Sequence, residues 1–349
     1  MRVVVLGATG NIGYSAVKAM SGDQTVTEIV GVARRLPDWS PPRTRFVAAD
    51  VTRDDLTPHL RGADVAMLLT WSFHPTRDPV ATWNVNVLGT IRALEAAAEA
   101  GVGAVVYVSS VGAYSPGPGR IVDETWPTHS LPTAAYGREK SYLERYLDAY
   151  ELRHPQIRVA RLRPSFVFQR ASGSEQRRIF AGPLLPGPLL RRGRLPVVPV
   201  PSGLRFQAVH GDDVGEALRL LATREARGAY NVAGDPIIDA AALGDLMGAK
   251  PVEISHAPVV LALGVASRLR LVPAEEGLLR LFLSLPTMDT SRIRDELGWS
   301  PRVTGVMALR EALDGMAEGA GAPTAPLQPG RATGMPERGT PEASTTTKE

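Results

Sequence analysis

The sequence predicts an α/β fold with a doubly wound, mostly parallel sheet and a smaller, discontinuous C-terminal substrate domain. Short apolar runs recur along the chain and are continuous rather than alternating, which is typical of strands buried on both faces of a parallel sheet. Segments with helical periodicity separate these runs, as β-α-β crossovers require. The runs that we expect to be strands are 2–6, 29–33, 46–50, 65–70, 104–110 and 157–164.

Three of the separating segments carry a clear helical pattern. They cover 12–20, 78–101 and 134–153, and Gly101 stands where a helix C-cap is expected. Further along, 209–223 resembles a helix, and the strand-like run that follows it would return the chain to the main sheet at 229–234.

The composition changes from about residue 166. A stretch rich in Pro and Gly at 180–203 predicts irregular structure with short strands, and 239–285 looks mostly helical. Beyond 316 the chain has almost no large apolar residues. The domain boundaries expected are 1–165 plus 206–236 for the sheet domain, 166–205 plus 237–315 for the substrate domain, and 316–349 for a disordered tail.

Composition excludes several kinds of protein. The chain of 349 residues is 44% hydrophobic and 21% charged, as in soluble globular proteins. It has no cysteine, and its six His show no HxxxH spacing, so we expect neither disulfides nor a metal site. The net charge is only +3 with the cations spread along the chain, which argues against nucleic acid. We expect no membrane partner, because no apolar run is long enough to cross a bilayer and residues 2–6 look like a buried strand. A cytoplasmic location follows.

A glycine-rich stretch, GATGNIG, lies between the first predicted strand and the first predicted helix. Glycines at this spacing allow a tight turn and the close approach of a pyrophosphate, whose charge the helix N-terminus meets. A plain glycine turn is the alternative, but the strand-turn-helix context favours dinucleotide binding and a Rossmann-type fold. The residues expected to hold the cofactor here are Gly7, Thr9, Gly10, Asn11, Ile12 and Gly13.

The end of the second strand indicates which dinucleotide is bound. An NAD site usually offers an acid about 20 residues after the glycines for the ribose 2′-OH. Arg34 and Arg35 occupy that place, and Asp38 lies too far along to replace the acid. Two cations suit a 2′-phosphate, so NADP(H) is preferred over NAD(H), although solvated loop arginines would give the same sequence.

The third strand is followed by Asp50 and Val51, in FVAADVT. Asp50 is placed to contact the adenine, with Val51 beside it in the cofactor site. A turn or cap role for Asp50 before the DDL segment is the alternative.

Tyr136 and Lys140 stand four residues apart in YGREK, near the start of a long predicted helix, and therefore share one helix face. The same spacing occurs in Tyr14 and Lys18, directly behind the glycine turn. Only the pair in YGREK follows the strand that ends in VSS, which brings a serine to the carboxyl edge of the sheet. We therefore expect the pair in YGREK to act in chemistry, Tyr14 to pack or to lie at the cofactor's phosphate end, and Lys18 to face solvent.

A Ser, a Tyr and a Lys beside a nicotinamide suit hydride transfer coupled to proton transfer. Free Tyr titrates near pH 10, too high for efficient proton exchange at neutrality. A nearby ammonium and the positively charged nicotinamide both favour the phenolate. We therefore expect Tyr136 to be the acid/base, Lys140 to lower its pKa and hold the ribose, and a serine to bind the substrate oxygen.

The chain resembles the extended short-chain dehydrogenase/reductases, the NAD(P)-dependent epimerase/dehydratase family, over about residues 1–315. The motifs that carry the resemblance are GATGNIG, AADVTR, NVLGT, VYVSSVGAY, YGREK, the RP at 163–164 and VHGDDVGEAL. The resemblance implies that Ser110, four residues before Tyr114, is catalytic together with Tyr136 and Lys140. It also implies that Asn86 supports the active site, although Asn86 could be an ordinary helix residue.

Departures from the family pattern affect the expected reaction. Dehydratases of the family have acidic residues just after the catalytic Ser or Thr position, where this chain has Val111 and Gly112. Its sugar-nucleotide epimerases usually have an acid after the second strand and an Arg four residues before a conserved His, whereas Arg205 stands five before His210 here. Phe168 replaces the usual Tyr after the RP segment, and Gln169 the usual Gly, so the substrate pocket is expected to be unusual.

Three functions remain open on this basis. The first is an NADP(H)-linked reductase or dehydrogenase of a ketone or secondary alcohol. The second is a sugar-nucleotide epimerase with tightly bound NAD, in which the arginines between 177 and 205 meet a substrate diphosphate. The third is a cofactor-binding regulatory module without turnover. The resemblance further implies a homodimer formed by the helices at 78–100 and 135–153.

Overall fold

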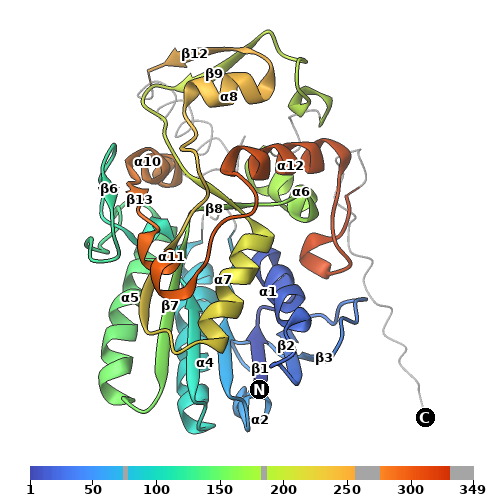
Figure 1. Cartoon of the computed structure of the whole chain (residues 1–349), viewed down its shortest axis with the longest axis vertical. Coiled ribbons are helices and arrows are strands. Elements are labelled where there is room, and N and C mark those ends of the chain that lie inside the picture. The colour runs from blue at the N-terminus through green and yellow to red at the C-terminus, as the bar shows by residue number, and fades with distance from the viewer. Residues whose placement is uncertain (74–77, 182–186, 256–275, 331–349) are drawn as a thin grey trace, which may run out of the picture.

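A seven-stranded parallel sheet forms the centre of the molecule, in the strand order β11-β7-β5-β4-β1-β2-β3 (Figure 1). The computed structural model describes residues 1–73, 78–181, 187–255 and 276–330. The order reverses at β1, which pairs with β2 on one side and β4 on the other. The strands are β1 Arg2–Leu6, β2 Glu28–Ala33, β3 Thr44–Ala48, β4 Val65–Leu68, β5 Ala104–Val108, β7 Arg158–Pro164 and β11 Gly228–Val232.

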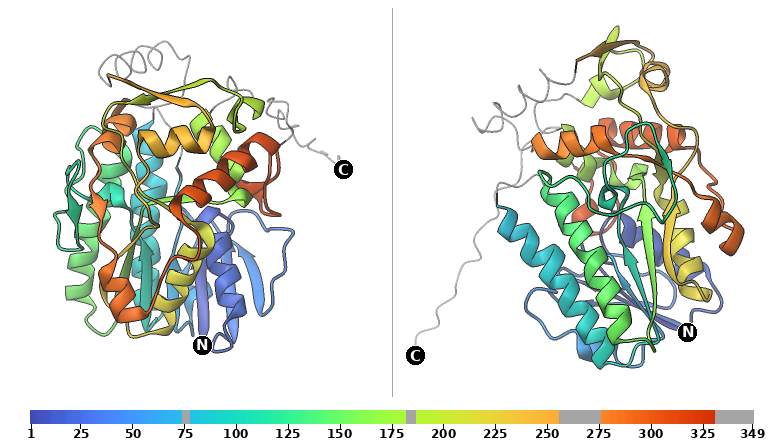
Figure 2. Two further views of the ribbon diagram at one scale, coloured as in Figure 1. Left: turned by 45° about the horizontal axis from the view of Figure 1, so that its top comes forward. Right: turned by 90° about the vertical axis from the view of Figure 1, so that its left-hand side faces the viewer.

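Helices cover both faces of this sheet. Helices α1 (Asn11–Gly22) and α7 (Gly211–Thr223) pack together on one face, and α4 (Gly89–Glu99) and α5 (Ala135–Arg153) lie on the other (Figure 2). Their apolar stripes meet continuously apolar strands, so each face has its own hydrophobic cluster. The doubly wound α/β fold predicted from the sequence is confirmed.

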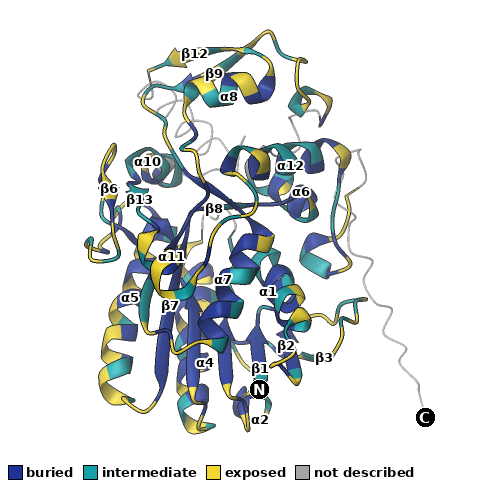
Figure 3. Cartoon of the chain, in the orientation of Figure 1, coloured by how far each residue is buried: buried dark blue, intermediate teal, exposed yellow. Residues whose placement is uncertain are grey.

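Burial explains why the predicted strands form where they do. Whereas the edge strand β3 has no buried residue, four of the five residues of β1 and all seven of β7 are buried (Figure 3). Such strands bury side chains on both faces and need no polar alternation. Helix α7 begins where the side chain of His210 accepts a hydrogen bond from the amide of Asp212, and acidic residues in its first turn suit the helix dipole.

The segment predicted as one helix over 78–101 is divided into three parts. Helix α3 (Pro79–Trp83) leads into the π-helical turn η1 (Asn84–Leu88), which leads into α4. The widened turn contains Asn86, whose side chain is buried and bonds to neighbouring elements rather than to solvent. Such π turns often occur at functional sites.

Above the carboxyl edge of the sheet lies a second region built from separated segments (Figure 1). Strand β8 (Phe166–Phe168) pairs with β10 (Ala208–His210), and β9 (Val197–Pro201) pairs with β12 (Lys250–Ile254). The helices of this region are α6 (Gly173–Gln176), α8 (Ala240–Met247), α10 (Glu276–Ser284) and α12 (Gly305–Glu318). The remaining short elements are α2 Thr57–Leu60, β6 Ile121–Val122, β13 Thr287–Met288 and α11 Ser291–Leu297.

Two details of the predicted organisation differ from the structure. The segment predicted to be mostly helical contains the strand β12, and its residues 256–275 lie outside the described residues. In the predicted substrate segment 237–315, Ile293 and Trp299 are buried in the hydrophobic cluster between the main sheet and helices α1 and α7. The chain therefore returns to the sheet domain before it builds α12.

The prediction of a disordered tail from 316 is wrong for residues 316–330. Helix α12 runs to Glu318, and the segment after it folds back, with Leu327 fully buried. The hydroxyl of Thr324 donates to the Thr9 carbonyl at 2.8 Å. One large apolar side chain and hydrogen bonds to distant segments hold the residues after α12, so their composition gave no signal of order. Residues 331–349 lie outside the described residues. Within the part of the chain that is described, no helix has the length and apolarity needed to cross a membrane.

Candidate active site

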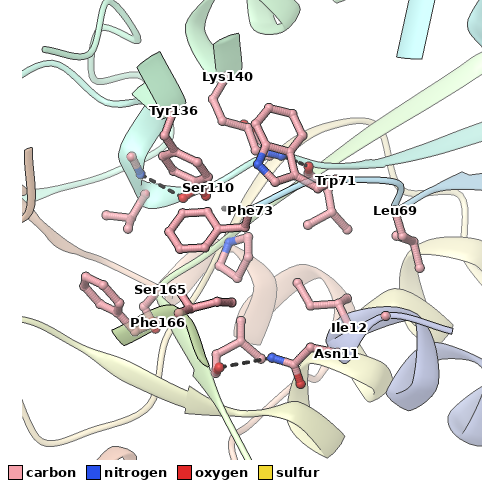
Figure 4. Close-up of a pocket in the computed structure, with 18 of the residues that line it drawn as sticks. Asn11, Ile12, Leu69, Trp71, Phe73, Ser110, Tyr136, Lys140, Ser165 and Phe166 are labelled. Carbon is pink, nitrogen blue, oxygen red and sulfur yellow. Dashed lines mark hydrogen bonds between the residues drawn. The ribbon is translucent and has the colours of Figure 1, made fainter. Parts of the chain in front are cut away.

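A cavity of about 240 Å³ opens at the carboxyl edge of the sheet, between the glycine turn and the second region. Its wall includes Ser110, Tyr136 and Lys140 on one side and residues 10–13 on another (Figure 4). Open α/β sheets bind ligands at this edge, where the strand order reverses. The structure thus brings together the predicted Ser-Tyr-Lys set and the predicted cofactor turn.

The glycine turn is shaped by close backbone contacts. Gly7 has φ +85°, and a Cβ there would lie 2.7 Å from the amide nitrogen of Thr70. A Cβ on Gly13 would lie 2.0 Å from the Gly7 carbonyl oxygen. Gly10 caps α1 without a side-chain hydrogen bond, because glycine has no side chain to accept from the first amides of the helix. The turn therefore fits a pyrophosphate, and Asn11 and Ile12 at the start of α1 line the cavity.

The other predicted cofactor residues lie beyond the wall of this cavity. Arg34 and Arg35 directly follow β2 and are exposed, while Val51 is buried. The Asp50 carboxylate accepts hydrogen bonds from the amide of Thr52 at 3.0 Å and from its hydroxyl at 2.7 Å. Burial opposes ionisation of Asp50, but these bonds and the charge of Arg34 hold its pKa below the usual value. Asp50 therefore takes the turn role that the sequence left open, beside Arg34.

Ser110 and Tyr136 meet in the cavity. The Ser110 hydroxyl, just after β5, accepts a hydrogen bond from the Gly112 amide at 2.9 Å and is hydrogen-bonded to Tyr136. A Cβ on Gly112 would lie 2.7 Å from the Tyr136 ring, so this glycine makes room for the ring. Burial, which outweighs the hydrogen bond with Ser110, raises the pKa of Tyr136 to about 12.

The Lys140 ammonium contacts groups other than the Tyr136 hydroxyl in this structure. Its ammonium donates to the Val108 carbonyl at 2.8 Å and lies 3.4 Å from the centroid of the Trp71 ring. Burial lowers the pKa of Lys140 well below its usual value, opposed by the carboxylates of Glu144 and Glu139. The expected lowering of the Tyr136 pKa is therefore absent from this structure, because desolvation dominates both groups.

Asn86 holds the wall of the cavity rather than the reacting groups. Its side chain accepts from the Ser72 amide at 2.7 Å and donates to the Ser72 carbonyl at 3.2 Å. It also donates to the Glu139 carboxylate at 2.7 Å, which accepts a further bond from Thr82 at 2.6 Å. Asn86 thereby fixes the segment that carries Trp71 and Phe73.

Sequence reasoning missed two sets of residues in this site. Trp71 and Phe73 meet the Tyr136 ring edge-on, at centroid distances of 5.7 and 5.1 Å. Their position directly after the fourth strand could have indicated a place at the carboxyl edge. Glu175 and Gln176 also line the cavity, but α6 has only four residues and offers no periodic signal.

Gln169, which replaces the family's glycine, ties the second region to the glycine turn. Its amide nitrogen donates to the carbonyl and the side-chain oxygen of Asn11, at 3.1 and 2.6 Å, and to the Ser15 hydroxyl at 3.1 Å. The substitution therefore adds contacts next to the cofactor turn.

The earlier Tyr/Lys pair lies elsewhere. The Tyr14 ring packs against Trp39 with centroids 4.6 Å apart, and Lys18 forms an exposed ion pair with Asp212 at 2.9 Å. Neither residue is among those that line the cavity. The prediction that Tyr14 packs is confirmed, and Lys18 faces solvent as expected.

Comparisons with known proteins identify the family. The profile described as "NAD dependent epimerase/dehydratase family" matches residues 3–233. An uncharacterized protein of Mycobacterium tuberculosis is 28% identical over 312 residues, which is 86% of this chain and 28% of that protein's length. The chain therefore spans less than a third of the length of this relative.

Solved structures share the fold. UDP-glucose 4-epimerase of Thermus thermophilus, in complex with NAD, has a TM-score of 0.67 at 21% identity, covering 90% of this chain and 99% of that one. The dTDP-glucose 4,6-dehydratase of Streptomyces venezuelae, with NAD bound, has a TM-score of 0.66 at 21% identity, covering 90% and 96%. The two proteins have different reactions in their names, so this likeness carries the fold and not the reaction.

Proposed function

Because the chain belongs to the NAD dependent epimerase/dehydratase family, and is thus an enzyme of the short-chain dehydrogenase/reductase superfamily, we propose that it is an NADP(H)-linked reductase or dehydrogenase of a ketone or secondary alcohol. One observation carries this proposal. The hydroxyls of Ser110 and Tyr136 meet in a cavity whose remaining wall is mainly aromatic and aliphatic.

The two hydroxyls suit proton transfer at a carbonyl oxygen. With its pKa raised to about 12, Tyr136 is neutral at physiological pH and can donate its proton to that oxygen. Ser110 supplies a second hydroxyl that can hold the same oxygen in place. In the direction of reduction, the carbonyl oxygen gains the Tyr136 proton while the carbonyl carbon gains a hydride, and the product is an alcohol.

The residues present fit a nicotinamide dinucleotide. The uncapped N-terminus of α1 and the close-packed glycines fit the pyrophosphate, and we expect Lys140, which lines the same cavity, to bind a ribose hydroxyl. Arg34 and Arg35, exposed directly after β2, favour a 2′-phosphate and therefore NADP(H). The chemistry that this cofactor supplies when bound is the donation or acceptance of the hydride.

The wall of the cavity favours a substrate without a diphosphate. Among the described residues that line it, Lys140 is the one cation, and it faces the Val108 carbonyl. Arg178, Arg191, Arg192, Arg194 and Arg205 are exposed and do not line it, and Arg177 is not among its lining residues either. Glu175, on the same wall, would repel a diphosphate.

The test is steady oxidation of NADPH by the purified full chain with a panel of ketones, compared with NADH at equal concentration. We expect turnover with at least one ketone and a higher kcat/KM with NADPH. Arg34→Ala and Arg35→Ala should lower kcat/KM for NADPH and leave that for NADH nearly unchanged. Turnover with no ketone, or a preference for NADH in the wild type, would contradict the proposal.

A second candidate function is a sugar-nucleotide epimerase that retains NAD. The likeness to UDP-glucose 4-epimerase over 90% of the chain favours it. Mass analysis of the denatured, freshly purified protein separates the two candidates. Stoichiometric NAD released from the protein supports the epimerase, and protein free of dinucleotide supports the reductase.

A homodimer remains a prediction. Its proposed interface includes α5 and the segment from α3 to α4, where Val80, Leu88, Tyr142 and Leu152 are exposed apolar side chains. Such a surface supports association with a second copy. The molar mass in solution, measured by light scattering, tests it.

A further inference from the structure

The cavity contains polar atoms that no group in the described part of the chain satisfies. The indole nitrogen of Trp71, the hydroxyl of Ser165 and the side-chain oxygen of Gln176 are buried and have no hydrogen-bond partner there. All three residues line the cavity. Buried polar groups in folded proteins are almost always paired, but unpaired atoms also occur outside the cavity, on Arg2, His154 and Arg161, so these three atoms support a ligand site only together with the cavity that their residues line.

Glu175 stands beside Gln176 on the same wall. No hydrogen bond to its carboxylate comes from the described residues, and Arg178 is the charge that acts on it. Arg178 is exposed, and its guanidinium donates to the Pro326 carbonyl at 2.7 Å. Burial raises the pKa of Glu175 to about 7. A carboxylate that is shielded from water and has no hydrogen-bond partner gains more free energy from a cationic partner than an exposed carboxylate would.

We propose that Glu175 and the side-chain oxygen of Gln176 form a subsite that binds a protonated amino group of the substrate. The substrate class is then an amino ketone or amino alcohol. Both groups are hydrogen-bond acceptors, whereas an ammonium offers three donors and a charge opposite to that of Glu175. This inference rests on the proposed function, because it names the substrate of the same site.

Aromatic rings around the cavity support a cation in preference to a neutral hydroxyl. Phe166 and Phe282 line it and meet edge-on, with centroids 4.9 Å apart. Ring faces attract ammonium groups, most strongly where water is excluded. A carboxylate and aromatic rings that line one cavity therefore favour a substrate with a charged amine and an apolar body.

Binding of two matched probes, benzylamine and benzyl alcohol, tests the subsite without turnover. Benzylamine carries an ammonium where benzyl alcohol carries a hydroxyl, and the two probes are otherwise alike. We expect isothermal titration of the full chain at pH 8 to show at least tenfold tighter binding of benzylamine. The isosteric variant Glu175→Gln should lose this preference, with its melting temperature maintained. Glu225→Gln is the matched control, because that carboxylate is almost fully exposed and distant from the cavity, and the preference should remain.

Three results would overturn the inference. They are equal binding of the two probes to the wild type, a preference that survives in Glu175→Gln, and a weaker affinity of Glu175→Gln for NADPH, which would assign the carboxylate to the cofactor. Failure of the reductase proposal is distinguishable from these. If none of the ketones is reduced, but the wild type still prefers benzylamine and Glu175→Gln does not, then the subsite stands and the assigned reaction is wrong.

Discussion

Two adjacent serines after β5 belong to opposite kinds of environment. Ser109 donates to the Glu144 carboxylate at 2.6 Å, inside a network of ion pairs between α5 and β7. Both serines line the cavity, but Ser110 takes no part in this network: its hydroxyl accepts a hydrogen bond from the Gly112 amide and meets Tyr136. One residue of sequence thus separates a closed polar network from an open polar site.

The closed network is centred on Glu144, which is fully buried. Arg163 donates to both of its oxygens, at 3.0 and 2.9 Å, and Arg161 donates at 3.2 Å. Arg161 is paired further with Asp148 at 2.7 Å. Burial opposes ionisation of Glu144, but its partners hold its pKa at about 2. Every charge in this network has a partner, so its role is to hold α5 against the sheet.

In the cavity, by contrast, several polar groups have no hydrogen-bond partner in the described part of the chain. They are the carboxylate of Glu175, which is half-buried, and the buried unpartnered atoms of Trp71, Ser165 and Gln176. Burial makes an unpaired polar group costly, so a fold retains such groups where a ligand completes them. Among the described residues, buried atoms without hydrogen-bond partners also occur outside the cavity, on Arg2, His154 and Arg161, so the contrast lies between the paired charges of the network and the cavity wall and does not extend to every unpaired atom.

The largest expected effect is on turnover. Tyr136→Phe removes the proton donor, and the lost acid/base catalysis should lower kcat about 10²- to 10⁴-fold. Lys140→Ala should lower it similarly by removing the ribose contact. The rate of NADPH oxidation with the best ketone measures both. Tyr14→Phe and Lys18→Ala are the matched controls, and a comparable loss in either would refute the assignment.

Removal of the central charge of the closed network should destabilise the fold. Glu144→Gln leaves the guanidinium of Arg163 buried without its anion, which should cost about 3–5 kcal/mol of unfolding free energy. Glu95→Gln breaks an exposed pair with Arg153 and should cost under about 1 kcal/mol. Urea unfolding followed by circular dichroism measures both, and equal costs would contradict the comparison.

Acid should weaken the fold through the same network. The pKa of Glu144 is depressed from 4.5 to about 2, so its stabilisation is complete above the unfolded value and is lost as pH falls through the folded value. The shift corresponds to about 3 kcal/mol. The unfolding free energy of the wild type should fall toward that of Glu144→Gln between about pH 5 and 2. A constant difference between the two proteins across that window is the contrary outcome.

The smallest effect on stability is expected in the cavity. Ser165→Ala removes a buried hydroxyl that lacks a partner, so the unfolding free energy should change by less than about 1 kcal/mol or increase. Gln176→Leu also removes the bond from its side-chain nitrogen to the Val167 carbonyl, so it should cost about 0.5–1.5 kcal/mol. Urea unfolding measures these changes, and the affinity for benzylamine measures the separate effect on ligand binding. A loss of several kcal/mol in either variant would mean that these atoms support the fold.

Local patterns allowed much of the fold to be predicted. The strands of the main sheet are continuous apolar runs. The glycine turn is recognised by the spacing of its glycines, and YGREK by the spacing of Tyr136 and Lys140. The Glu144 network was not predictable, because Ser109 and Arg163 come from different strands that meet only in the folded sheet. The C-terminal segment was missed because one buried leucine, Leu327, gives no periodic pattern.

The most direct test of the central claim compares Ser109→Ala with Ser110→Ala. Turnover per folded molecule and unfolding free energy are measured for each. We predict that Ser110→Ala loses turnover at least tenfold with unchanged stability, whereas Ser109→Ala loses about 1.5–3 kcal/mol of stability and keeps its turnover. The opposite pattern, or the same loss in both variants, would contradict the account.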